Sequence, residues 1–268
     1  GNENADGSED NNSLTLSVDT VRPTIAITSD VDSLKAFQNA SLIFTLSEAS
    51  TDFIESDIIV SGGTLVNFIE RSSTVYTANF YPVDEHTSST TEGIILVEDT
   101  KFSDSFGNTN SDGYDADNIV TFSIDTVRPT IEITSDVDSL KAGENAALIF
   151  TLSEASTDFI ESDIIVSGGT LVNFIERSST VYTANFYPVD EHTSSTTEGI
   201  ILVEDTKFSD SFGNTNSDGY DADNIVTFSI DTVRPTIEIT SDVDSLKAGE
   251  TTTVTFTLSE AASDFIEG

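Results

Sequence analysis

Residues 122–136 read FSIDTVRPTIEITSD, a stretch that contains two alternating apolar runs joined by a short segment with Arg and Pro. Its central VRPTI begins at Val21, Val127 and Val233, so the sequence repeats with a period of 106 residues. Residues 21–126 and 127–232 differ at only four positions, which are Ala26/Glu132, Phe37/Gly143, Gln38/Glu144 and Ser41/Ala147. Regular arrays add the same span and the same surface with each copy, which favours a structural or adhesive role over catalysis.

The repeat predicts four segments. We expect complete domains over 21–126 and 127–232, the C-terminal end of a preceding repeat over 1–20, and the N-terminal part of a further repeat over 233–268. The ends therefore indicate a piece of a longer protein. A unit of 106 residues is long enough to bury one β-sandwich core.

Short alternating runs bounded by Gly, Asp, Asn and Ser dominate each repeat, and no stretch keeps a helical period for long. The spacing suits an all-β, immunoglobulin-like β-sandwich, and the short Pro-containing linker predicts domains arranged end to end with limited freedom. In the first repeat we predict seven strands, near 24–29, 41–47, 57–61, 64–70, 74–81, 93–98 and 118–125.

Comparison of the copies predicts which side chains face the core. SLIFTLS at 41–47 becomes TVTFTLS at 253–259, so Ile43 occupies a position where threonine is tolerated and must face outward. Strand 93–98 is apolar on both faces, and its register stays open. The same alternation predicts these inward side chains: Ile25, Ile27, Leu42, Phe44, Leu46, Tyr76, Ala78, Phe80, Val120, Phe122 and Ile124.

Charge bounds the possible partners. The chain has 48 acidic and 10 basic residues, a net charge of −38, and residues 127–232 alone hold 19 acids and 4 bases. This balance argues against nucleic acid or an anionic membrane as partner and predicts cations instead. Cysteine is absent, so disulfides and thiolate metal sites are excluded. No apolar run is long enough for a membrane span, so direct membrane insertion is not expected.

Acidic residues concentrate in the loops at 47–57 and 98–118, which an immunoglobulin-like fold places at the pole where the chain enters. Carboxylates that converge there would repel one another, and a calcium ion with oxygen ligands would relieve the repulsion. The alternative is a solvated acidic surface without an ion. The predicted ligands are Asp19, Glu48, Asp52 and Asp104, and in the next repeat Asp125, Glu154, Asp158 and Asp210.

Within the loop at 98–118, the sequence NTNSDG matches the first half of a calcium loop, in which alternate oxygen-bearing side chains turn to one ion. The acidic residue expected at the twelfth position is missing, since Ile119 stands there, and a nearby aspartate would replace it. An ordinary turn rich in Asn and Gly is the alternative. The predicted ligands are Asn108, Asn110, Asp112 and Asp115, and in the next repeat Asn214, Asn216, Asp218 and Asp221.

Two further features have structural interpretations. Phe102 and Phe106 are predicted to pin the long loop to the sandwich. His86 and His192 occupy one position in the two copies, and we expect an exposed loop histidine, since nothing nearby supplies hydrolase machinery.

Six segments together resemble the bacterial immunoglobulin-like repeats of very large secreted adhesins, including biofilm-associated and RTX-type adhesins. They are FSIDTVRPTIEITSD, SLKAGE, FTLSEA, DIIVSGGTLVNF, YTANFYP and FSDSFGN, which follow the family order and cover most of each repeat. The resemblance implies calcium-stiffened extender rods that hold a distal binding domain away from the cell surface. Loops equivalent to 98–118 are often shorter in that family.

We therefore expect non-catalytic extender repeats of an extracellular or cell-surface adhesin, with neighbouring repeats and calcium as partners and a role in cell adhesion and biofilm formation. One alternative is a spacer in a secreted polysaccharide-active enzyme. Another is that the repeats themselves bind a ligand, with affinity multiplied along the array.

Overall fold

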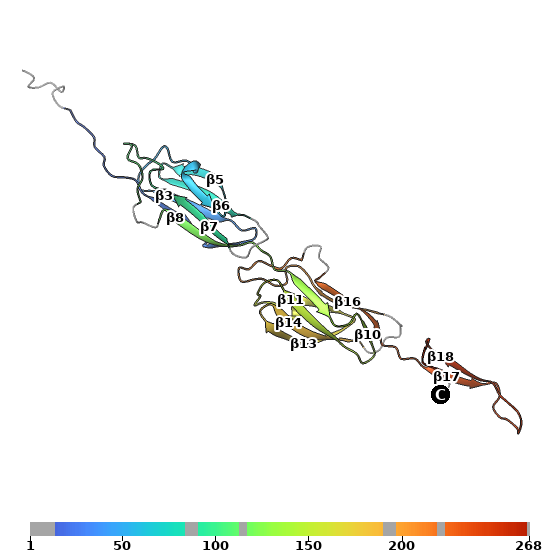
Figure 1. Cartoon of the computed structure of the whole chain (residues 1–268). Helices are drawn as coiled ribbons and strands as arrows, with labels where there is room; N and C mark the ends of the chain where they lie inside the picture. The colour runs from blue at the N-terminus through green and yellow to red at the C-terminus, as the bar shows by residue number, and fades with distance from the viewer. Residues whose placement is uncertain (1–13, 84–90, 113–116, 190–196, 219–222, 267–268) are drawn as a thin grey trace, which may run out of the picture. The chain divides into compact units, whose positions relative to one another are not determined.

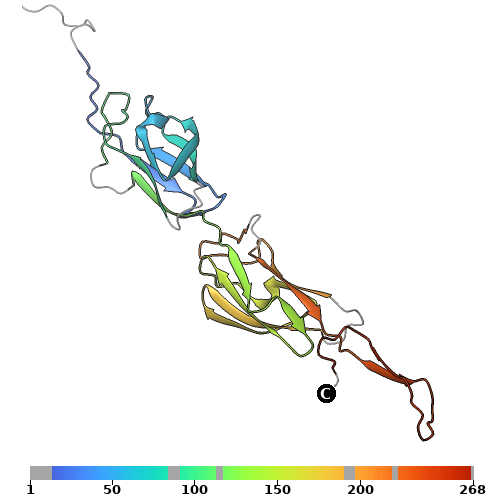
Figure 2. The ribbon, with the colours of Figure 1, turned by 45° about the vertical axis from the view of Figure 1, so that its right-hand side comes forward.

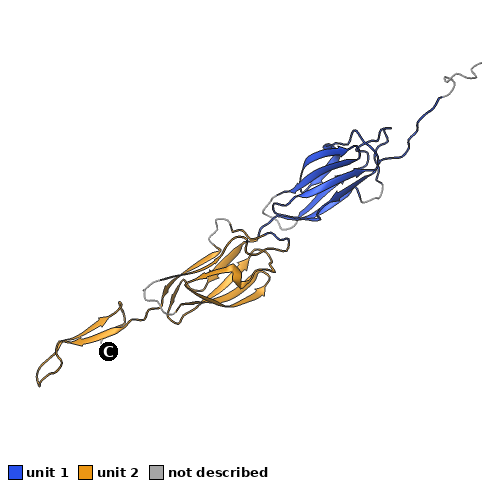
Figure 3. Ribbon diagram, turned by 180° about the vertical axis from the view of Figure 1, so that it is seen from behind, with its two compact units in different colours: residues 1–128, 212–214 blue, residues 129–211, 215–268 orange. Residues whose placement is uncertain are grey.

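The computed structural model describes residues 14–83, 91–112, 117–189, 197–218 and 223–266. These residues form two compact units, which Figure 3 shows in different colours. The first unit comprises residues 1–128 and 212–214, and the second comprises residues 129–211 and 215–268. No helix among the described residues is long and apolar enough to cross a membrane.

The first unit is a sandwich of two four-stranded sheets, seen from two directions in Figures 1 and 2. One sheet has the order β1-β3-β6-β5 and the other β2-β8-β7-β4, so the first and last strands of the domain lie in different sheets. All pairings are antiparallel except that of β2 with β8, which is parallel. The strands are β1 (Ile25–Ser29), β2 (Ser33–Lys35), β3 (Ala40–Leu46), β4 (Ile58–Ser61), β5 (Gly63–Ser72), β6 (Val75–Pro82), β7 (Thr91–Val97) and β8 (Ile119–Asp125), with a short 3-10 helix η2 (Glu55–Asp57) before β4.

The second unit repeats this sandwich, with sheets ordered β13-β14-β11-β9 and β10-β16-β15-β12. The third repeat contributes the antiparallel pair β17-β18. The elements are β9 (Ile131–Ser135), β10 (Ser139–Lys141), β11 (Ala146–Leu152), η3 (Glu161–Asp163), β12 (Ile164–Ser167), β13 (Gly169–Ser178), β14 (Val181–Pro188), β15 (Thr197–Val203), β16 (Ile225–Asp231), β17 (Ile237–Ser241) and β18 (Val254–Leu258).

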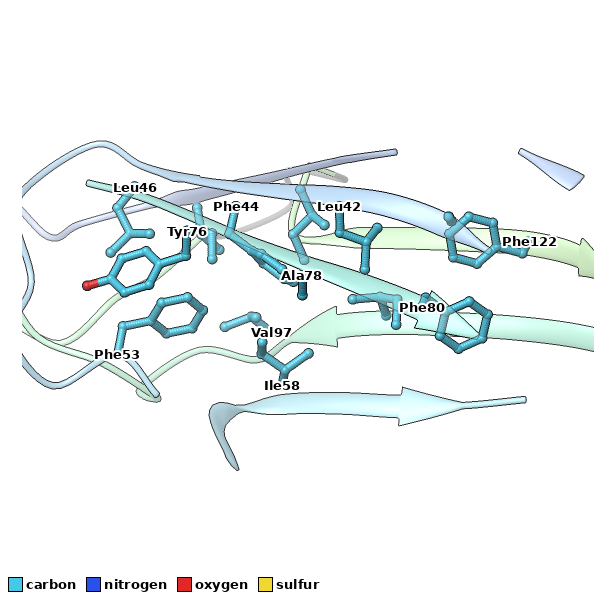
Figure 4. Close-up of a cluster of buried hydrophobic side chains, with 14 of the residues drawn as sticks. Leu42, Phe44, Leu46, Phe53, Ile58, Tyr76, Ala78, Phe80, Val97 and Phe122 are labelled. Atoms are coloured by element: carbon cyan, nitrogen blue, oxygen red, sulfur yellow. The ribbon is translucent and has the colours of Figure 1, made fainter. Parts of the chain in front are cut away.

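The core lies between the two sheets and follows the predicted alternation. On β3, Leu42, Phe44 and Leu46 are buried while Ile43 is 46% exposed, which confirms the register read from the copies. Figure 4 shows Leu42, Phe44 and Leu46 spread along this core, with Leu46 beside Tyr76 at one end and with Phe80 and Phe122 at the other. The rings of Phe80 and Phe122 stack at 5.1 Å. The other predicted inward residues are buried too, apart from Val120, which is partly buried against the cluster.

The structure also decides the register that the sequence left open. On β7, Ile95 and Val97 are fully buried, whereas Ile94 and Leu96 face outward and are partly exposed. The seven predicted strands are present, but the domain has one strand more, because the three-residue β2 went unpredicted. A run of three residues with only Leu34 buried is too short to show a period of two.

A candidate cation site where the chain enters the domain

The segment that enters the first domain is held by the loop between β7 and β8. Arg22 donates from Nε to the carbonyl oxygen of Thr109 at 2.9 Å and from its guanidinium to the Thr109 hydroxyl at 2.7 Å. Ser111 N donates to the carbonyl oxygen of Pro23 at 3.0 Å. The long loop therefore packs along the linker, and the entry point of the chain is fixed relative to this loop.

At this pole the carboxylates of Asp19, Glu48 and Asp104 meet. One oxygen of each lies within 4.8 Å of one oxygen of each of the others. Asp19 precedes the linker, Glu48 follows β3 and Asp104 lies between β7 and β8, so three separate segments supply the cluster. Asp104 is buried and the other two are half-buried.

The pKa values of Glu48 and Asp104 are shifted in opposite directions. Burial raises the pKa of Glu48, and the nearby charges of Asp19 and then Asp104 raise it further. Burial also acts to raise the pKa of Asp104, but hydrogen bonds from the side chain and backbone of Asn108 and from the backbone of Phe106 outweigh it, so the pKa lies below its ordinary value. The hydrogen bonds thus favour the ionised form of Asp104, whereas burial and repulsion between the carboxylates disfavour the ionised form of Glu48.

The oxygen geometry suits a hard cation. Calcium binds oxygen ligands at about 2.3–2.6 Å, so oxygens on opposite sides of an ion lie up to about 5 Å apart. The 4.8 Å spread of the three carboxylate oxygens falls within that distance. Asn108 adjoins the cluster, donating from Nδ2 to Asp104 Oδ2 at 2.8 Å and to the carbonyl oxygen of Asp19 at 3.3 Å. These residues fit a calcium ion chemically.

Asp52 has a different environment from the other predicted ligands. Its Oδ1 accepts hydrogen bonds from the Ser50 hydroxyl at 2.7 Å and from Ser103 N at 2.8 Å, and its Oδ2 accepts a short one from the Ser103 hydroxyl. Burial acts to raise the pKa of Asp52, yet these hydrogen bonds, led by that from the Ser103 hydroxyl, lower it overall. The Asp52 carboxylate therefore links the loop after β3 to the loop between β7 and β8. Asp158 makes the same contacts to Ser156 and Ser209.

Asn110 and Asp112 have structural contacts that the motif did not reveal. Asn110 is fully buried, and its Oδ1 accepts from Lys101 N at 2.7 Å and from Phe102 N at 3.1 Å. Its Nδ2 donates to the carbonyl oxygen of Glu98 at 3.0 Å. Asp112 Oδ1 accepts from Ile25 N at 2.7 Å, which attaches the loop to β1. Metal ligation by these residues stays a prediction, as do the roles of Asn216 and Asp218, which have the matching contacts in the second unit.

The remaining predicted residues divide as follows. Phe102 is 1% exposed and packs its ring 5.2 Å from that of Phe53, so it pins the loop as predicted. The prediction for Phe106 was wrong, because its side chain is 56% exposed. The corresponding three residues of the next repeat belong to different compact units, with Asp125 in the first unit and Glu154 and Asp210 in the second. That their carboxylates meet therefore stays a prediction.

Five further predicted residues either lie outside the described residues or belong to the other compact unit. Asp115, Asp221, His86 and His192 lie outside the described residues. Asn214 is grouped with the first unit, as part of residues 212–214.

A family model described as bacterial Ig-like domain matches the chain three times, over residues 19–122, 125–228 and 231–268. The chain belongs to the bacterial Ig-like domain family. The repeated all-β sandwiches described above agree with this assignment. In each complete bacterial Ig-like domain of this chain, the match includes the acidic loop that follows β3 or β11 and the whole of the long loop that precedes β8 or β16.

Several solved structures are similar to this chain at low identity. The Escherichia coli adhesin FdeC has 14% identity and a TM-score of 0.37, covering 93% of this chain and 76% of its own. Yersinia pseudotuberculosis InvD has 16% identity and a TM-score of 0.30, covering 82% and 64%. The I9–I11 tandem of titin has 11% identity and a TM-score of 0.29, covering 80% and 68%. A comparison with curated protein sequences gives no match. The fold assignment rests on the family match and the sheet topology.

Proposed function

We propose that these bacterial Ig-like domains are non-catalytic extender repeats of a bacterial surface or secreted adhesin, and that calcium stiffens them. The observation that carries this proposal is the triad of Asp19, Glu48 and Asp104, which joins the segment before the domain to two of its loops. Near-identical tandem copies support a structural role, because each copy adds the same length and the same site.

An ion bound by the triad would act in two ways. It would cancel repulsion among carboxylates, which the raised pKa of Glu48 reflects. It would also tie the segment at Asp19 to the loops that carry Glu48 and Asp104, so the entering chain would lose freedom. Binding to the folded state alone would raise stability by mass action. A stiffer array would hold a distal adhesive domain farther from the cell surface and so support adhesion and biofilm formation.

The test is thermal unfolding of the full chain in about 5 mM calcium, in equal magnesium and in excess chelator. Extracellular calcium sites bind with dissociation constants of about 0.1–1 mM, so about 5 mM calcium would add roughly 1–2 kcal/mol per site. We expect calcium to raise Tm by several degrees and magnesium to raise it much less. Unfolding curves that coincide in calcium and chelator would refute the calcium proposal.

Paired variants identify the ligands. Glu48→Gln with Glu154→Gln should abolish the calcium response and raise Tm in chelator, because a repelling charge is removed. Glu55→Gln with Glu161→Gln is the matched control, because these exposed glutamates lie in η2 and η3 outside the triad. A calcium response that survives in the first pair would exclude the triad as the binding site. Small-angle scattering should show that calcium increases the maximum dimension of the wild-type chain.

A further inference from the structure

The entering and leaving segments of each domain lie side by side and run in the same direction. In the first domain, the entry segment (residues 22–35) meets the exit segment (residues 109–112 and 117–125) at several points. Near the entry pole, Ile25 N donates to Asp112 Oδ1 at 2.7 Å and Ile27 N to the carbonyl oxygen of Asp117 at 2.7 Å. Toward the other pole, Ser123 N donates to the carbonyl oxygen of Asp32 at 3.1 Å. We call this contact the seam.

Strands β2 and β8 form the end of the seam. Their parallel register is Ser33↔Ser123, Leu34↔Ile124 and Lys35↔Asp125. Leu34 is 1% exposed and fastens β2 to the core, although its strand has only three residues. The seam therefore combines backbone pairing with one buried anchor.

The chain enters and leaves the domain at opposite poles. It enters beside the triad, where β1 begins and where the loop preceding β8 lies. It leaves after Asp125, at the far end of the seven-residue β8, which spans about 20 Å at roughly 3.3 Å per residue. Tension on the two ends pulls the entry segment toward one pole and β8 toward the other. The two sides of the seam would then slide past each other along their length.

This direction of loading matters because the hydrogen bonds of a strand pair lie across the strands. Sliding strains all of them together, whereas peeling from one end breaks them one after another. We propose that the seam is the contact that resists tension in each domain and that β2–β8 sets the rate at which a domain unfolds under tension. The inference rests on the proposed function to the extent that an extender is pulled by its ends.

The second domain repeats every part of the seam. β10 pairs with β16 in parallel through Ser139↔Ser229, Leu140↔Ile230 and Lys141↔Asp231. Ile131 N donates to Asp218 Oδ1 at 2.6 Å, and Ile133 N to the carbonyl oxygen of Asp223 at 2.7 Å. We therefore expect the two domains to unfold at similar rates under the same tension.

The experiment is constant-force unfolding of single full-length chains in excess chelator, with leucine truncated in both domains. Leu34→Ala with Leu140→Ala weakens the seam. Ile58→Ala with Ile164→Ala is the control, since it also removes three carbons from each buried side chain. These residues lie on β4 and β12, which among the described strands pair only with β7 and β15. Equilibrium denaturation establishes how far each pair lowers stability. Should either alanine pair fail to fold, the corresponding valine variants replace both.

We expect the seam variant to unfold at least about tenfold faster than wild type at the same force, because its lost contacts are those that break in the transition state. The control should unfold less than about threefold faster despite a comparable loss of equilibrium stability, because its contacts are still intact at that point. Equal acceleration in the two variants, or greater acceleration in the control, would overturn the proposal. Because the measurement is made without calcium, a failed calcium test leaves the seam result standing, and a failed seam test leaves the calcium response intact.

Discussion

Replacing Asn110 with alanine, together with Asn216 in the second domain, should destabilise the protein equally with and without calcium. The sequence motif suggests a calcium ligand at this position, but the Asn110 side chain already has backbone partners. Its Oδ1 accepts from Lys101 N and Phe102 N, and its Nδ2 donates to the carbonyl oxygen of Glu98. The amide holds the start of the long loop in shape.

The size of the effect follows from these three hydrogen bonds. Alanine would leave backbone groups unpaired, including that of the buried Phe102, at a cost of about 1–3 kcal/mol for each buried group left unsatisfied. Because water can reach part of the loop and satisfy some of these groups, we expect the free energy of unfolding to fall by about 2–4 kcal/mol per domain. A domain of 106 residues unfolds with an entropy of roughly 0.2 kcal/mol/K, so Tm should fall by about 9–18 °C.

The assay is thermal unfolding of the double variant by circular dichroism, in chelator and in about 5 mM calcium. Asn79→Ala with Asn185→Ala is the matched control, because Asn79 is partly exposed on β6 and its side-chain oxygen accepts a long hydrogen bond from Asn67 Nδ2 at 3.5 Å. The control should change stability by less than about 0.5 kcal/mol. If the Asn110 variant lost stability only in calcium, the amide would act as an ion ligand and the reasoning from its backbone contacts would be refuted.

Three further predictions concern other parts of the first domain. Because the pKa of Asp52 is lowered in the fold, its stabilisation is complete above the ordinary carboxyl pKa of about 4 and disappears as pH falls through the lowered value. Acid titrations should thus show a smaller loss of stability for Asp52→Asn than for wild type below about pH 4, and parallel curves would contradict this. Phe37 adopts φ 64° and is 79% exposed where the second repeat has Gly143, so Phe37→Gly should stabilise the domain by about 1 kcal/mol in urea denaturation, with Gly143→Phe giving the opposite change. A Cβ at Gly63 would collide with the carbonyl oxygen of Tyr81, so Gly63→Ala should cost about 3 kcal/mol or more, and a soluble variant of wild-type Tm would refute the packing.

Much of the fold could be predicted because alternation in a half-buried strand has a period of two. The replacement of Ile43 by Thr255 in the third copy was enough to orient β3, and that orientation was confirmed. Strand β7 could not be oriented in this way, because Ile94 and Leu96 are apolar although they face outward. The prediction that Phe106 packs on the sandwich failed for a related reason, since the identity of an aromatic residue in a loop does not show whether the fold buries it.

The candidate site was predictable in part. Strand parity brought Asp19, Glu48 and Asp104 to one pole, as the structure has them. Asp52 lies in the same loop as Glu48, yet Ser50 and Ser103 take up its oxygens. A count of acidic residues cannot show which carboxylates lie within reach of one another, because that depends on the direction of each side chain.

The repeat, the all-β sandwich and the faces of most strands could be predicted from the amino-acid sequence, since near-identical copies and a period of two are visible along the chain itself. The partners of residues far apart in the chain could be identified only once the strands were placed in three dimensions. The parallel pairing of β2 with β8 joins residues 90 positions apart, as in Ser33↔Ser123, and Asp112 bonds to Ile25 across 87. Such contacts depend on how the sheets close around the core, which no local pattern of residues records.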